Sequence, residues 1–257
     1  MLRFRSLGSG STGNATLVES GGPSPVRLLV DCGLGIRQLQ ARLGEAGLET
    51  NQINAIFITH EHGDHIGCAL AVSRRHSIPV WMSQGTHTAI GAPDFGGLLR
   101  IARDGVAIDA GGIEITPFTV PHDASEPLQL TCTDGAAKLG VVTDLGHATA
   151  HVLAHLERCD ALLLECNHDT DMLARSAYPD FLKRRVGGAY GHLSNSAAAD
   201  IARSVMHQGL KHVVAAHLSV QNNKAELVQR DLSAALGCAS TDIIVATPQA
   251  GTRWLPA

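Results

Sequence analysis

The sequence predicts an α/β fold in which helical and strand layers stack as an αββα sandwich. Strand patterns dominate the first half of the chain, whereas helices and strands alternate in the second half. Two sheets packed face to face, with helices on both outer surfaces, are the simplest layered arrangement of these elements. The 257 residues are 44% hydrophobic and contain no dividing linker. We therefore expect one large core and a single domain spanning residues 1–257.

The first half opens with three expected strands separated by glycine-rich turns. The first turn, from Gly8 to Gly13, matches the dinucleotide-binding pattern G-x-G-x-x-G. That pattern requires a following helix, and here a strand pattern continues, so we exclude a dinucleotide site. The expected strands of this half are 2–7, 14–19, 26–31, 53–58, 79–82, 113–118, 128–132 and 139–143, and the expected helices are 36–46 and 66–76.

The second half shows a regular alternation of elements. Helical periodicity predicts helices at 147–156, 196–207 and 225–236, and short apolar runs predict strands at 161–165, 212–216 and 242–246. Open α/β architectures expose their functional groups where such strands end. Polar residues that follow the strands are therefore the first candidates for a functional site.

Charge and composition argue against several classes of protein. The net charge of −4 argues against a broadly basic surface, so any contact with phosphate has to be local. We find no signal peptide and no run of 18 apolar residues, and expect a cytoplasmic protein without membrane association. The six cysteines contain no Cys-x-x-Cys pair, which argues against a thiolate zinc site or a disulfide framework.

The clearest functional signal is a cluster of metal-ligand side chains directly after an apolar run. Four such residues, His60, His62, Asp64 and His65, occur within six positions. Imidazole and carboxylate groups at this spacing suit two adjacent metal ions. Gly63 argues against a continuous helix, so we predict that the cluster lies on a loop at a strand end. A zincin helix is excluded because Asp64 stands where that motif requires histidine.

Four other strands end in an acidic residue or a histidine. These residues are Asp31, His122, Asp144 and His217. Taken singly, each is more typical of a strand cap or a paired polar residue than of a ligand. At one shared sheet edge, however, they would join the histidine cluster and complete a set of metal ligands.

This ordered pattern resembles the metallo-β-lactamase superfamily over nearly the whole chain. The resemblance implies a sandwich of that type with two divalent metal ions, zinc or manganese, with iron as a further option. It implies that His60, His62 and His122 hold one metal, that Asp64, His65 and His217 hold the other, and that Asp144 bridges them. Asp31 would orient the histidine loop. Redox di-iron members carry glutamate at the position of His62, so the histidine here favours hydrolysis.

Finer motifs resemble the YycJ (WalJ) group of phosphodiesterases and exonucleases and, less closely, the PhnP and RNase Z groups. They are Ser9-Gly10-Ser11-Thr12-Gly13-Asn14, Glu165-Cys166-Asn167-His168-Asp169, Tyr178-Pro179, Gly191-His192-Leu193-Ser194-Asn195 and His217-Leu218-Ser219. This group implies a 5′ exonuclease-like enzyme that hydrolyses phosphodiester bonds with a metal-bridging hydroxide. β-CASP nucleases insert a second domain between the bridging aspartate and the last histidine, whereas here that interval predicts ordinary helices and strands.

The resemblance also implies three catalytic positions, Asp64, His192 and Asp31. His192 would contact the scissile phosphate or protonate the leaving oxygen. It precedes a helix start that Ser194 or Asn195 can cap, and a helix start can bind phosphate. Without the family pattern, the alternative for His192 is a solvent-exposed loop histidine, which is the less favoured of the two interpretations.

Other residues are candidates for binding substrate. Lys183, Arg184 and Arg185 suit a clamp on a non-scissile phosphate, although a solvated helix face explains them equally well. Aromatic residues make up only 4% of the chain, so base stacking would rest on a few of them, such as Tyr178 and Tyr190. The remaining candidates are the polar residues Ser194, Asn195, Ser219, Asn222, Asn223 and Asn167.

The sequence thus favours a phosphodiesterase that acts on nucleic acid or on a small phosphodiester. The alternative is a thioester or lactone hydrolase, which predicts that removal of His192 has little effect. The intact ligand set argues against a non-catalytic scaffold. Metal identity, the choice between DNA and RNA, the direction of digestion and the oligomeric state, a homodimer included, have no readable signature.

Overall fold

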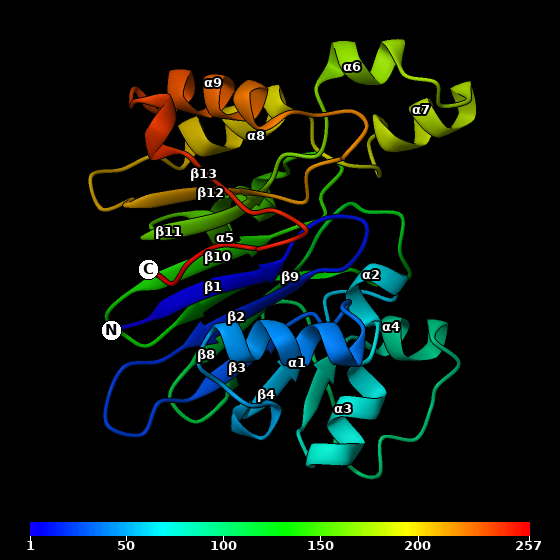
Figure 1. Cartoon of the computed structure of the whole chain (residues 1–257), viewed down its shortest axis with the longest axis vertical. Coiled ribbons are helices and arrows are strands. Elements are labelled where there is room, and N and C mark those ends of the chain that lie inside the picture. Colours follow the sequence, from blue (N-terminus) through cyan, green and yellow to red (C-terminus); the bar gives the residue numbers. More distant parts are fainter.

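Two seven-stranded sheets face each other in the computed structural model, which describes residues 1–257 (Figure 1). The first sheet contains β1 (Arg3–Gly8), β2 (Ala15–Glu19), β3 (Arg27–Val30), β4 (Ala55–Phe57), β5 (Val80–Met82), β6 (Leu99–Ile101) and β14 (Leu255–Pro256), in the order β14-β1-β2-β3-β4-β5-β6. The second contains β7 (Ile108–Asp109), β8 (Glu114–Thr119), β9 (Leu128–Thr133), β10 (Lys138–Val142), β11 (Ala161–Glu165), β12 (His212–Ala216) and β13 (Ile244–Val245), in the order β13-β12-β11-β10-β9-β8-β7.

The two sheets are accompanied by helices, several of which cover the outer sheet faces. They are α1 (Ile36–Glu45), α2 (Gly63–Ile66), α3 (Ala69–His76), α4 (Gln84–Ala89), α5 (Ala150–Leu156), α6 (Thr170–Arg175), α7 (Asp180–Val186), α8 (Asn195–Ser204) and α9 (Ala225–Leu236), with short 3-10 turns at Thr50–Gln52 and Ser240–Asp242. Helices α1 and α3 pack on the first sheet, and α5, α8 and α9 pack on the second. The predicted αββα sandwich is therefore confirmed. No helix combines the length and the apolar character that crossing a membrane requires.

The strands are apolar on both faces because both faces are covered. Leu28 and Val30 of β3 belong to the core between the sheets, whereas Leu29 lies between the first sheet and its helices. On the second sheet, Leu163 faces the inner core and Leu164 faces the outer helices. Side chains that alternate between two buried layers explain why these strands read as continuous apolar runs.

Strand direction brings distant parts of the chain to one edge of the sandwich. In the first sheet β3 runs parallel to β4, and in the second β10, β11 and β12 run parallel to one another. Asp31 follows β3, while Asp144 and His217 follow β10 and β12. The carboxyl ends of parallel strands share an edge, and ligands bind there in open α/β sheets.

The structure corrects two expectations around the histidine cluster. His60 and His62 lie in a loop after β4, but Gly63 starts the short helix α2, which carries Asp64 and His65. The prediction that the whole cluster lies on a loop is therefore wrong for the last two ligand candidates. The helix expected at 66–76 is also divided, because Gly67 has φ of 32° and α3 begins only at Ala69.

Candidate metal centre

Asp31 anchors the loop that carries the first histidines. Its φ of 60° is uncommon for a residue other than glycine. Its Oδ1 accepts a hydrogen bond from the Thr59 backbone N–H at 2.9 Å, and its Oδ2 lies 2.7 Å from Nδ1 of His65. Because Asp31 is only 1% exposed, this buried pair fixes the ring of His65 and leaves its Nε2 for the centre of the cluster.

All seven residues predicted as metal ligands come together at this edge. The first set consists of His60, His62 and His122, and the second consists of Asp64, His65 and His217; within each set the potential ligand atoms lie within 4.8 Å of one another. Asp144 lies between the sets. One of its carboxylate oxygens lies 3.0 Å from His65 Nε2, and the other lies 3.1 Å from His217 Nδ1 and 3.8 Å from His122 Nε2.

The glycine-rich turn between β1 and β2 supports this cluster. Ser9 Oγ accepts a hydrogen bond from the His217 backbone N–H at 2.7 Å, where His217 has φ of 53°. The Asn14 backbone N–H donates to the Asp64 carbonyl at 2.8 Å. Within the turn, the Asn14 side chain accepts from the Gly10 N–H. The turn therefore positions a ligand candidate from each of the two sheets.

Glu165, at the end of β11, is a residue of this cluster whose contacts the sequence did not reveal. It is fully buried, and its Oε1 lies 2.7 Å from His192 Nδ1 and 3.3 Å from His217 Nδ1. Its Oε2 accepts hydrogen bonds from the backbone N–H groups of Leu145 and Leu193. One carboxylate thus connects the side chains of His192 and His217 to the backbone of Leu145 and Leu193, which directly follow Asp144 and His192. Its place directly before Cys166 at a strand end was the available signal.

His192 lies at the open side of the cluster. Its side chain is 22% exposed, compared with 2% for Asp144, whose Oδ1 lies 3.3 Å from His192 Nδ1. Both carboxylates therefore face the same ring nitrogen. Nδ1 is held from within the protein, which leaves Nε2 directed away from these carboxylates.

The charges of the cluster depend on one another. Burial by itself would lower the pKa of His65, but Asp144 and Asp31 outweigh it and raise the pKa to about 10. Burial also lowers the pKa of His192, but Glu165 and Asp144 outweigh burial and raise this pKa to about 9. For the Asp144 carboxyl, burial raises the pKa, but His217 and His65 prevail and hold it well below its ordinary value.

The donor set fits divalent metal ions. Burial and a positively charged neighbour, His65, keep the pKa of His60 well below its usual value, so this imidazole is neutral, the form that binds metal. Asp144 Oδ2 and His217 Nε2 are buried polar atoms that form no well-aligned hydrogen bond, although Oδ2 lies 3.0 Å from His65 Nε2. Buried carboxylates need compensating positive charge. In the metal-free protein, protonated histidines supply this positive charge. Metal cations bound at the same position would supply it instead of the protons.

Several residues predicted to bind substrate make bonds inside the protein. Asn195 and Asn223 pair through their side-chain amides, and Asn167 donates from Nδ2 to the His217 carbonyl. These three residues are at most 6% exposed. The Asn222 backbone N–H donates to Ser219 Oγ. These side chains are therefore engaged in hydrogen bonds within the protein, and their contact with substrate stays a prediction.

The other substrate candidates lie nearer the surface. Ser194 caps α8, as expected, because its Oγ accepts the Ala197 backbone N–H. Lys183 donates to the Ala174 carbonyl, and Arg185 pairs with Asp123. Arg184 is exposed and forms no ion pair.

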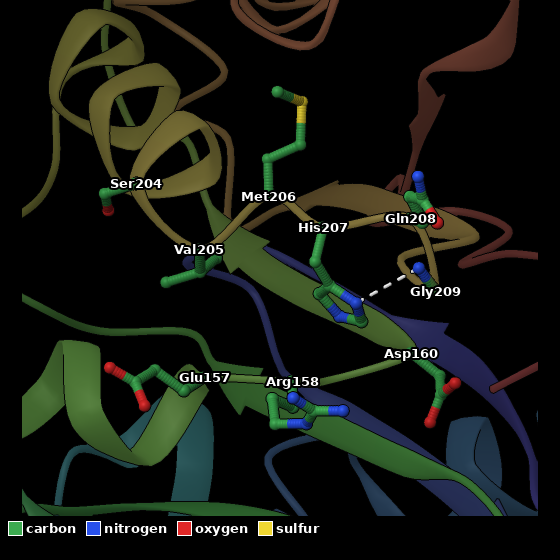
Figure 2. A pocket seen from close by; sticks show the side chains of 9 residues that line it. All are labelled: Glu157, Arg158, Asp160, Ser204, Val205, Met206, His207, Gln208 and Gly209. Atoms are coloured by element: carbon green, nitrogen blue, oxygen red, sulfur yellow. Dashed lines mark hydrogen bonds between the residues drawn. The ribbon is translucent and has the colours of Figure 1, made fainter.

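A large surface hollow lies at the opposite end of the second sheet (Figure 2). It has a volume of about 800 Å³ and is lined in part by Asp160 and His207, close to the starts of β11 and β12. His207 is used internally, since Nε2 lies 2.9 Å from the Cys159 carbonyl and Nδ1 accepts the Gly209 N–H. The hollow is remote from the histidine cluster, so its size does not identify the functional site.

Comparisons with known proteins agree with this geometry. The family model described as "Beta-lactamase superfamily domain" matches residues 26–218. The chain is 34% identical over 239 residues to exodeoxyribonuclease YycJ of Bacillus anthracis, a match that covers 91% of this chain and 89% of that protein. It is 30% identical over 230 residues to exodeoxyribonuclease WalJ of Streptococcus pneumoniae, covering 88% of this chain and 84% of that protein.

A solved structure shows the same fold. The metallo-β-lactamase fold protein YhfI from Bacillus subtilis superposes with a TM-score of 0.76 at 17% identity, over 99% of each chain. The predicted resemblance is therefore confirmed by the family model, by the two sequence relatives and by the fold. The chain belongs to the metallo-β-lactamase superfamily and, within it, to the family of YycJ and WalJ.

Proposed function

We propose that this chain is a dinuclear metal-dependent phosphodiesterase that degrades DNA as an exonuclease. The observation that carries the proposal is the position of Asp144, a buried carboxylate that contacts histidines of both ligand sets while His192 stands beside it at the open side. The activity named for the YycJ and WalJ relatives supports the choice of DNA. Residues 1–257 act as one domain in this proposal, consistent with the pairing of β14 with β1.

The two sets of side chains would each hold one divalent ion, with Asp144 shared between them. Such ions lower the pKa of water and offset the charge that grows on phosphoryl oxygens during hydrolysis. Histidine and carboxylate donors suit zinc, manganese or iron(II), and we propose zinc or manganese. The chain's contribution is to fix the donors, and Asp31 and Glu165 do so from behind the histidine rings.

His192 is the proposed proton donor for the leaving oxygen. Glu165 holds its Nδ1 at 2.7 Å, so Nε2 is the nitrogen available to substrate. In the metal-free protein, Glu165 and Asp144 outweigh the effect of burial and raise its pKa to about 9, which favours the protonated ring at neutral pH. General acids placed in this way contribute about 10²- to 10⁴-fold to rate.

A substrate panel tests the proposal. Hydrolysis of bis-p-nitrophenyl phosphate and of a 5′-labelled DNA oligonucleotide is compared with hydrolysis of a thioester and a lactone, with zinc or manganese added. The variants are His192→Ala and, as a matched control, His76→Ala at the end of the outer helix α3. We expect phosphodiester cleavage that collapses in His192→Ala alone. Carbonyl hydrolysis unaffected by either variant would reject the proposal in favour of an acyl hydrolase.

A further inference from the structure

The exposed aromatic residues gather in one short part of the chain. Of five phenylalanines, four are at most 2% exposed, whereas Phe181 on α7 is 66% exposed. Of the two tyrosines, Tyr190 is 63% exposed. Both lie between Glu165 and His192, in a stretch of residues 170–191 that contains α6 and α7 and that we call the rim segment. In a chain with so few aromatic residues, this concentration requires an explanation.

Packing does not explain these side chains. Helix α7 buries none of its residues, and only Leu173 of α6 is buried. In Figure 1, α6 and α7 stand apart from the two-sheet body and from the helices that cover it. The rim segment therefore contributes little to the core, and Phe181, which is 66% exposed, gains little stability from burial in its present position.

The rim segment is nevertheless attached to the metal centre. Arg185 pairs with Asp123, which lies next to the ligand candidate His122 and approaches its Nε2 to 3.5 Å. The Gly191 carbonyl lies 3.0 Å from His122 Nδ1. A Cβ atom added to Gly146 would meet the Ala189 carbonyl oxygen at 2.1 Å, so the loop before His192 rests on the backbone that follows Asp144.

The charge of α7 is opposite in sign to that of the whole chain. The helix contains three basic residues, Lys183, Arg184 and Arg185, and one acidic residue, Asp180, whereas the net charge of the protein is −4. Lys183 and Arg185 have partners within the protein, but Arg184 is exposed without one. Proteins that bind single-stranded nucleic acid combine basic residues, which contact phosphates, with exposed aromatic rings, on which the bases stack. Arg184 and Phe181 on α7 provide this combination.

We infer that Phe181 and Tyr190 stack on unpaired bases of a DNA strand whose scissile phosphate lies at the metal centre, and that Arg184 contacts a phosphate of the same strand. The inference rests on the proposed function and deepens it, because it names the substrate as a single-stranded end. Stacking does not depend on base identity, since every base has an aromatic face. The rim segment thus holds the strand without choosing a sequence.

Two substrates of different size separate this role from an effect on the metal centre. We expect Phe181→Ala with Tyr190→Ala to lower kcat/KM for a single-stranded oligonucleotide by at least about tenfold, since each lost stack corresponds to roughly 5- to 150-fold. Hydrolysis of bis-p-nitrophenyl phosphate, which has no DNA strand to be held by Phe181 and Tyr190, stays unchanged. Phe181→Trp, made alone in the wild type, keeps an aromatic ring at this position and should retain the oligonucleotide rate. The matched control Met206→Ala removes a 51% exposed side chain in the remote hollow and changes neither rate.

Binding and oligomeric state complete the test. Fluorescence anisotropy with a labelled single-stranded oligonucleotide measures the interaction without catalysis, and loss of binding in the double variant supports the inference even if the wild type cleaves no phosphodiester. That last result rejects only the proposed function. Equal losses on both substrates, or unchanged binding, overturn the stacking role. Sedimentation of the wild type as a dimer that Phe181→Ala dissociates would assign this surface to a second copy of the chain and overturn it as well.

Discussion

The metal centre and the rim segment lie side by side but are built in opposite ways. Asp144 and His217 are at most 2% exposed and are fixed by strand ends, buried carboxylates and backbone hydrogen bonds. The rim segment is largely exposed and carries Phe181 and Arg184 away from any core. This difference separates two tasks. Changes at the centre should affect every substrate, whereas changes at the rim should affect only substrates long enough to reach it.

Asp144→Ala should have the largest effect. It removes the carboxylate that contacts histidines of both ligand sets, so the donor set loses the group shared between them. Because such sites contribute several kcal/mol of charge stabilisation, we expect kcat/KM to fall at least about a thousandfold for small and large substrates alike. Asp200→Ala, which removes a surface carboxylate that is 73% exposed, is the matched control and should retain activity. A loss of activity restricted to oligonucleotides would contradict the claim that changes at the metal centre affect every substrate.

Glu165→Gln keeps the shape of a positioning residue and removes its charge. Burial lowers the pKa of His192 and Glu165 opposes it, so the substitution should bring that pKa down from about 9. We expect kcat/KM to fall about 10- to 100-fold and the alkaline limb of the pH–rate profile to move to lower pH. A purely structural role would lower the rate without moving the limb, and that result would contradict the account.

Gly146→Ala tests the contact between the two regions. The new Cβ would press on the Ala189 carbonyl oxygen, and the loop that leads to His192 would have to shift. We expect a loss of about tenfold on both substrates, together with about 1–3 kcal/mol of stability. Gly44→Ala on α1, where an added Cβ meets nothing within 4 Å, is the control and should be stable and active. An effect on oligonucleotides alone would mean that the rim moves independently of the centre.

Removal of metal should expose the pH dependence of the centre. Without metal, burial lowers the pKa of His65, but the carboxylates of Asp144 and Asp31 outweigh burial and raise this pKa to about 10. A raised folded-state pKa stabilises the fold below the ordinary value near 6.5, and this contribution disappears as pH rises toward 10. Chelated protein should therefore lose stability between pH 7 and 10 relative to metal-loaded protein, with a Tm change of about 2–4 °C per kcal/mol. A gap between the two forms that narrows with pH would contradict this.

Periodic apolar patterns account for the parts of the fold that the sequence predicted. Strands β11 and β12 and helix α9 span the predicted residues 161–165, 212–216 and 225–236, because each buries an apolar run against a neighbour. Helices α6 and α7 were missed because they have almost no buried face, and periodicity depends on burial. Strand β14 was missed because two residues, Leu255 and Pro256, are strand only through pairing with β1.

The candidate site was predictable for a similar reason. Its ligand candidates follow apolar strands, so the strand pattern itself indicated that Asp144 and His217 would meet. The contacts that support the ligand candidates could not be predicted from the sequence. Glu165 is recognisable only from its distances to His192 and His217, and the inward pairing of Asn195 with Asn223 depends on tertiary packing.

The central claim is that the chain holds two divalent ions in the two ligand sets joined by Asp144. Native mass spectrometry of chelated protein, as zinc or manganese is added back, counts the ions directly, and hydrolysis of bis-p-nitrophenyl phosphate is measured on the same samples. We predict uptake of two ions per chain in the wild type, with activity that rises as they bind. Full activity in protein that holds no ion, or binding of two ions without any phosphodiester hydrolysis, would contradict the account.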